Sequence, residues 1–173
     1  MAHGGRLRLS KRISGPCHSR VKVARAARRI TLRFSGGATF SEVWLETALI
    51  EPRGCQGSLL FHSLNQATSK GNILFSNPAN GEVRSDGTLK LSEDDSRTWI
   101  KSFRYAKKPA PNFTGYSDLA VMPDGSVGVL YERGDLTDAS KHSERYDEVG
   151  FIVVPFSEIR APLPPAPAQG STP

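Results

Sequence analysis

One stretch decides the fold of this 173-residue chain: residues 115–133, with the sequence GYSDLAVMPDGSVGVLYER. Two short strand-like runs, 117–121 and 127–131, flank Pro123-Asp124-Gly125. This tripeptide favours a turn because Pro presets φ, Asp bonds its own backbone and Gly adopts a positive φ. The stretch therefore predicts a β-hairpin. If the hairpin is symmetric about Asp124, Tyr116 lies opposite Glu132 at one end of a sheet.

Similar strand signals recur at short intervals along the chain, with Gly, Pro, Asn and Asp between them. No helical periodicity competes with them, so the pattern indicates an all-β sandwich, barrel or propeller. No run of about 18 uncharged apolar residues occurs, so we expect no membrane span. The predicted strands are 30–34, 58–61, 72–76, 88–91, 117–121, 127–131 and 149–154.

The net charge of +6 comes from the N-terminal part of the chain. No Asp or Glu precedes Glu42, whereas residues 1–41 contain many Arg and Lys residues. Such a segment is typical of an organellar transit peptide, of a basic arm that contacts nucleic acid or anionic lipid, or of a solvated disordered leader. We expect residues 1–34 to be a disordered leader, 35–160 to fold, and 161–173 to be a disordered Pro/Ala-rich tail.

Several functional classes have no support in the sequence. No apolar core follows the first basic residues, so a secretory signal is not expected, and an intracellular location (cytoplasmic or lysosomal) is favoured. Cys17 and Cys55 make neither a disulfide framework nor a metal site. The four His residues show no metal-ligand spacing. We therefore expect no cofactor and no metal.

Residues 92–99, SEDDSRTW, match the Asp-box pattern S-x-D-x-G-x-T-W except that Ser96 replaces Gly. In such a hairpin turn the Asp side chain collects turn N–H groups and the Trp ring is buried beneath the loop. Residues 35–40, SGGATF, look like a shortened second copy that lacks the Asp. Two related turns in a β-rich chain indicate repeated propeller blades.

Further short motifs occur in a fixed order along the chain. They are GCQGS (54–58), LFSNP (74–78), RSDG (84–87), the Asp box, YSDL (116–119) and LYE (130–132). In order and approximate spacing the chain resembles exo-α-sialidases (neuraminidases), from about Thr39 to Phe156. The resemblance covers the last third of that family's six-bladed propeller. It implies a partial β-propeller of about two to three four-stranded blades with Asp-box turns.

The resemblance implies release of terminal sialic acid, with retention, from a sialylated glycoprotein, oligosaccharide or glycolipid. The substrate carries a carboxylate on its anomeric carbon, which would repel an Asp or Glu nucleophile, so sialidases use a Tyr. Arginines supply planar bidentate donors for that carboxylate. The residues that match are Tyr116 (nucleophile), Glu132 (orients the arginine triad), Arg84 (third arginine), Arg28 or Arg29 (second arginine) and Gln56 (pocket beside the glycerol side chain).

The chain also departs from the family. The first arginine, the acid/base Asp and the Glu that activates the nucleophile belong to earlier blades, and no carboxylate precedes Glu42. We therefore expect an incomplete sialidase. One alternative is an inactive sialoglycan-binding relic or fragment. Another is a nucleic-acid-binding protein built on the leader, but the folded part has no basic face interleaved with aromatic residues.

Overall fold

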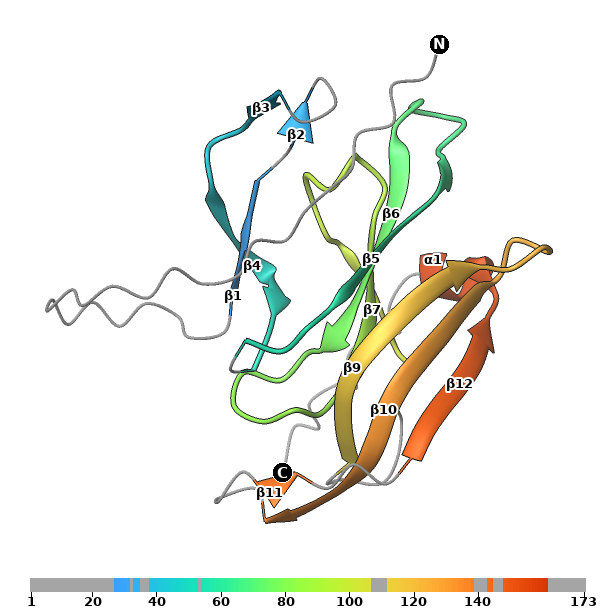
Figure 1. The fold of residues 1–173 in the computed structure, drawn as a ribbon. Coiled ribbons are helices and arrows are strands. Elements are labelled where there is room, and N and C mark those ends of the chain that lie inside the picture. Colours follow the sequence, from blue (N-terminus) through green and yellow to red (C-terminus); the bar gives the residue numbers. More distant parts are fainter. Residues whose placement is uncertain are drawn as a thin grey trace, which may run out of the picture.

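The computed structural model describes residues 27–31, 33–34, 38–52, 54–106, 112–138, 143–144 and 148–161. These residues form antiparallel sheets and the short helix α1 (Phe156–Arg160) (Figure 1). The all-β prediction is confirmed. The strands are β1 (Ala27–Ile30), β2 (Arg33–Phe34), β3 (Thr39–Phe40), β4 (Trp44–Ile50), β5 (Ser58–Leu64), β6 (Gly71–Pro78), β7 (Gly87–Ser92), β8 (Lys101–Arg104), β9 (Asn112–Val121), β10 (Val127–Asp138), β11 (Ser143–Glu144) and β12 (Glu148–Val154).

The middle layer is a four-stranded sheet in the order β5-β6-β7-β8. Successive side chains of a strand point to opposite faces, and β6 is buried on both. Leu74 belongs to a core shared with the next sheet, whereas Phe75 belongs to a separate core shared with β1 and β4. This sheet is therefore covered on both faces, as Figure 1 shows.

The second large sheet contains β9, β10 and β12, and β11 also pairs with β10. Its inner face packs Val127, Val129 and Tyr131 against the middle sheet. Its opposite face is open. Leu130 pairs with Phe151, and their side chains are 48% and 57% exposed.

The predicted hairpin is confirmed. Val127 pairs with Val121 and Tyr131 with Ser117, so the two strands are symmetric about Asp124. The Asp124 carboxylate accepts the N–H of Ser126 at 3.0 Å, and Gly125 has a φ of +81°. The strands continue well beyond the predicted ends.

A third layer begins before the predicted domain boundary at residue 34. Strand β1 pairs with β4, and Ile30 and Leu49 are each 1% exposed against Phe75 and Trp99. This hydrophobic burial holds β1 in the folded part, although the sequence analysis placed residues 27–30 in the leader. Strands β2 and β3 pair across the shortened box, whose residues 35–37 lie outside the described residues. The rest of the leader (1–26) and most of the tail (162–173) also lie outside them.

The Asp box forms the predicted turn between β7 and β8. The Asp94 carboxylate accepts the N–H groups of Arg97 (3.1 Å) and Thr98 (2.8 Å) and the hydroxyls of Ser92 and Thr98 (both 2.8 Å). Burial alone would raise the pKa of Asp94, but these hydrogen bonds outweigh it and lower the pKa below its ordinary value. The ring of Trp99 is buried, as expected.

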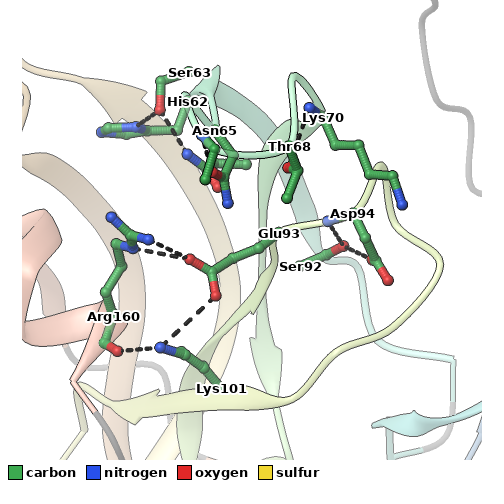
Figure 2. Close-up of polar contacts among 12 residues, drawn as sticks. His62, Ser63, Asn65, Thr68, Lys70, Ser92, Glu93, Asp94, Lys101 and Arg160 are labelled. Carbon is green, nitrogen blue, oxygen red and sulfur yellow. Dashed lines mark hydrogen bonds and ion pairs between the residues drawn. The ribbon is translucent and has the colours of Figure 1, made fainter.

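Helix α1 ties the C-terminal end of the second sheet to this turn. The carboxylate of Glu93 lies between the side chains of Arg160 and Lys101, at 2.8 Å and 3.7 Å (Figure 2). His62 on β5 stacks on Phe156 at 3.8 Å between ring centroids, and its Nε2 donates to the carbonyl of Gly125 at 2.8 Å. Both contacts bind the two large sheets to each other at one end.

The structure also contains elements that the sequence did not predict, namely β3, β4, β8, β11 and α1. The predicted strand 30–34 corresponds to two strands, the end of β1 and the whole of β2. Helix α1 has only five residues, too few to give a helical period. Among the described residues, no helix has the length and apolar composition needed to cross a membrane.

Candidate functional site

Tyr116 and Arg84 meet midway along β9 and not at the predicted end of the sheet, because β9 and β10 stay paired as far as Asn112 and Asp135. Tyr116 lies on β9 and is 47% exposed. The guanidinium carbon of Arg84 lies 5.4 Å from the centroid of the Tyr116 ring, which is cation–π distance. The two residues that the sequence analysis assigned to nucleophile and carboxylate binder are therefore neighbours, although they come from different sheets.

Glu132 lies against the backbone of Tyr116, as the hairpin symmetry predicted. A β-bulge interrupts the β9–β10 pairing between Tyr131 and Arg133, where Gly115 and Tyr116 of β9 lie opposite the single residue Glu132 of β10. In place of a ladder bond, the N–H of Tyr116 donates to Oε2 of Glu132 at 2.9 Å. Bulges often redirect a side chain at functional sites, and here the bulge lies in β9 at Gly115 and Tyr116.

Gly115 makes this approach possible. A Cβ at position 115 would lie 2.2 Å from Oε2 of Glu132 and 3.2 Å from its Cβ. The sequence analysis did not single out Gly115. The signal was present in the sequence, because a glycine within a strand often marks a bulge or a close approach.

Arg84 is held in the loop between β6 and β7. Its carbonyl accepts the N–H of Thr114 at 2.9 Å, and Ser85 forms a bridge with Phe113. Asp86, which has a φ of +62°, pairs with the side chain of Arg104. The loop is thus attached to β9 just before Tyr116, which fixes Arg84 near the phenol ring.

Of the two candidates for a second arginine, Arg28 is the one directed into the molecule. It pairs with Glu51 at 3.1 Å, donates to the carbonyl of Cys55 at 2.5 Å and lies over the ring of Phe75. Burial lowers the pKa of Arg28, and Glu51 opposes this. The side chain of Arg29 is exposed.

Cys55 lies within the electrostatic reach of both Arg28 and Arg84. Burial raises the pKa of its thiol to about 11, while the charges of Arg84 and then Arg28 act in the opposite direction. The thiol is 2% exposed and stays protonated at neutral pH. Cys55 is therefore a buried, unreactive neighbour of the two arginines.

Gln56 binds the backbone next to Tyr116. Its Nε2 donates to the carbonyl of Ser117, and its Oε1 accepts the N–H of Ser117, both at 3.2 Å. Nearby, the hydroxyl of Ser58 donates to Asp118 at 2.8 Å. Sequence reasoning missed the contacts of Ser58, Ser117 and Asp118, because each joins residues about 60 positions apart.

A metal site is not apparent in the part of the chain that the structure describes. There, no three His, Cys, Asp or Glu side chains gather closely enough to hold an ion. The chemistry of the described site is that of a guanidinium, a phenol and a carboxylate.

Antiparallel sheets stacked face to face, one of them with an Asp-box turn between β7 and β8, are the arrangement of β-propeller blades. No family model matches the sequence. A sialidase from Micromonospora viridifaciens is 32% identical over 120 residues, which are 68% of this chain and 18% of that protein. A sialidase from Bacteroides fragilis is 26% identical over 61% of this chain and 20% of its own length.

Solved structures agree with these sequence relatives. The K499G mutant of the NanB sialidase from Streptococcus pneumoniae superposes with a TM-score of 0.64 at 20% identity, covering 79% of this chain and 21% of that one. This chain is a sialidase homologue over most of its length. It spans only 18% to 21% of the length of these relatives.

Proposed function

We propose that this chain forms the part of a sialidase active site that carries the tyrosine nucleophile and one arginine of the carboxylate-binding group. The reaction is release of terminal sialic acid from sialylated glycoconjugates. One observation carries the proposal: Arg84 lies 5.4 Å from the ring of the exposed Tyr116, whose backbone N–H is bound by Glu132.

The charges of this cluster suit an acidic sugar. A carboxylate nucleophile would be repelled by the sialic acid carboxylate, whereas a phenol is neutral as it approaches. A guanidinium beside the phenol offers bidentate hydrogen bonds to the same carboxylate, so binding and attack take place together. We assign the carboxylate contact to Arg84.

The proposed reaction has two steps and retains configuration. The Tyr116 oxygen forms a bond to the anomeric carbon while the glycosidic C–O bond breaks and the leaving oxygen takes a proton. Water then attacks the same carbon, and the phenol oxygen leaves. A phenol needs a base to attack at neutral pH, and the leaving group needs a proton donor. In this proposal both groups come from other blades of the sialidase.

For the second arginine we assign Arg28 rather than Arg29. Arg28 and Arg84 both act on the thiol of Cys55, which supports a position on the same side of the molecule. Glu132 supports the site in this proposal by orienting an arginine and by holding the backbone of Tyr116.

The second candidate function is sialoglycan binding without hydrolysis. It needs only a guanidinium beside a phenol ring, which Arg84 and Tyr116 supply at 5.4 Å. In that case Arg84 and Tyr116 form a partial pocket that recognises the acidic sugar.

A fluorogenic sialoside assay, run beside a binding measurement with free sialic acid, separates the two functions. Turnover that Tyr116→Phe abolishes supports hydrolysis, because only the phenol oxygen is removed. Binding without turnover, lost in Arg84→Met, supports the second function. Arg97→Met is the matched control, since Arg97 is exposed in the Asp-box turn. Neither turnover nor binding in the folded protein would refute both functions.

A further inference from the structure

Ser117, the residue after Tyr116, is held from more directions than its neighbours on β9. Both of its backbone polar groups bond the side-chain amide of Gln56, at 3.2 Å each. Strand β9 pairs only with β10 among the described strands, so the Gln56 amide acts where a further strand would pair. A single side chain thus completes the edge of the strand beside the phenol.

The side chain of Ser117 is fixed as well. Its hydroxyl lies 2.7 Å from the hydroxyl of Ser76 on β6, which lies 3.2 Å from the hydroxyl of Tyr105. These residues are 4%, 0% and 6% exposed, in that order. Buried hydroxyls that satisfy one another define a single position for the strand, because separating them leaves unpaired polar atoms in the core.

We propose that Gln56 and Ser76 are positioning residues, which fix the nucleophile through Ser117. The proposal rests on the function proposed for Tyr116. Glu132 binds the N–H of Tyr116 on one side of β9, and the Gln56 amide binds the backbone of Ser117. The peptide units on both sides of the Tyr116 Cα are therefore fixed. The side chain of Tyr116 starts from a defined backbone position, and Arg84 lies over its ring.

This role differs from the one that the sequence analysis gave to Gln56. There, Gln56 was expected to line the pocket beside the glycerol side chain of the sugar. In the structure its amide oxygen and its amide nitrogen both bond Ser117. Ser76 is completely buried, so it cannot contact a ligand directly, and its hydroxyl links Ser117 to Tyr105. Substitution of Ser76 therefore tests the positioning role more sharply than substitution of Gln56.

The experiment uses the full chain labelled with [¹³Cζ]tyrosine, in which the Tyr116 resonance is assigned by its loss in Tyr116→Phe. The variants are Gln56→Met, Ser76→Ala and both together, with Gln66→Met as the matched control in the exposed turn after β5. Three quantities are measured: the Tyr116 resonance, hydrogen exchange of the Ser117 amide, and the Kd for free N-acetylneuraminic acid. Urea unfolding shows that each variant is folded.

We expect both single variants to shift or broaden the Tyr116 resonance, and Gln56→Met to speed exchange at Ser117. Each should weaken sialic acid binding about tenfold or more, since small displacements at a reacting group have large effects. Because both act through Ser117, the double variant should lose less than the product of the two single effects. Gln66→Met should change none of these quantities.

Two outcomes would overturn the proposal. Gln56→Met could weaken binding while Ser76→Ala leaves both the Tyr116 resonance and the Kd unchanged, which would make Gln56 a ligand contact. Alternatively, neither variant could move the resonance. If the wild-type chain binds no sialic acid, the function proposed above fails. The resonance and the Ser117 exchange then still decide whether Gln56 and Ser76 position Tyr116.

Discussion

The two large sheets of this molecule have different surroundings. The sheet β5-β6-β7-β8 is buried on both faces, between β1–β4 and the second sheet. The sheet β9-β10-β12 is covered on one face only, and Leu130, Val149, Phe151 and Val153 are 48% to 69% exposed on the other. The first sheet carries the packing of the fold, and the second presents Tyr116 and Glu132. Mutations on the buried faces of the first sheet and on the open face of the second can therefore be compared directly.

The largest predicted difference lies between two phenylalanines. Phe75→Ala removes a ring that is 0% exposed between two layers, and it should lower the free energy of unfolding by about 3–5 kcal/mol. Phe151→Ala should change it by about 0.5 kcal/mol or less, because the ring is 57% exposed. Urea denaturation of both variants measures the contrast. Equal losses would show that the outer face of the second sheet is covered in solution.

The next largest loss of stability is expected for a substitution in the Asp box. Asp94→Ala removes an acceptor of two N–H groups and two hydroxyls. The loss should be about 2 kcal/mol at pH 7, the value of about one hydrogen bond to a charged group (about 1.5–3 kcal/mol), because the turn is largely exposed and water replaces most of the lost bonds. The pKa of Asp94 is lowered in the folded state. Its contribution is therefore present above the ordinary Asp pKa, about 4, and is lost as the pH falls below it.

Unfolding measurements from pH 7 down to pH 3 check this prediction. The difference between wild type and Asp94→Ala should narrow in acid, whereas the exposed control Glu42→Gln should follow wild type throughout. A difference that stays constant with pH would contradict the role of the ionised carboxylate.

A smaller effect on stability but a direct effect on the site is expected for Gly115→Ala. The new methyl would lie 2.2 Å from Oε2 of Glu132, so the carboxylate must leave the N–H of Tyr116. Overpacking of this kind costs about 1–3 kcal/mol, and the flexible end of Glu132 places this case at the lower end. Hydrogen exchange at the Tyr116 amide should accelerate. Unchanged exchange would show that the approach of Glu132 does not depend on glycine.

The smallest predicted effect is an increase in the free energy of unfolding. Ser96 replaces the usual Gly of the Asp box, has a φ of +67°, and its buried hydroxyl has no hydrogen-bond partner. Ser96→Gly should raise the free energy of unfolding by about 0.5–1 kcal/mol, because relief of a left-handed backbone slightly exceeds the entropic cost of glycine. The melting temperature measures it, and a decrease would contradict the account of this turn.

Local sequence determined what could be predicted. The hairpin register follows from one turn at Pro123-Asp124-Gly125, so the apposition of Tyr116 and Glu132 was predictable without knowledge of the rest of the fold. The Asp box was readable for the same reason, since Asp94 bonds groups within four residues of itself. Most strand positions in the two large sheets were also predictable, although β8 and β11 were missed and the lengths of β9 and β10 were underestimated.

Contacts between residues far apart in the sequence could not be predicted from local sequence patterns. The meeting of Arg84 with Tyr116 depends on how a loop of one sheet packs on another, and only the resemblance to sialidases suggested it. The Gln56–Ser117 contact joins residues 61 positions apart and leaves no periodic signal. Strand β4 mixes charged and apolar residues, and its burial depends on β1, which lay in a basic segment that was taken for a leader.

The central claim is that Arg84 and Tyr116 together recognise the carboxylate of an acidic sugar. Calorimetric titration with N-acetylneuraminic acid and with its methyl ester tests it most directly, because the ester differs only in the charge that Arg84 would bind. The account predicts that the acid binds at least about tenfold more tightly, which corresponds to about 1.4 kcal/mol, and that Arg84→Met removes this preference. Equal affinity for acid and ester, or a preference that survives Arg84→Met, would contradict it.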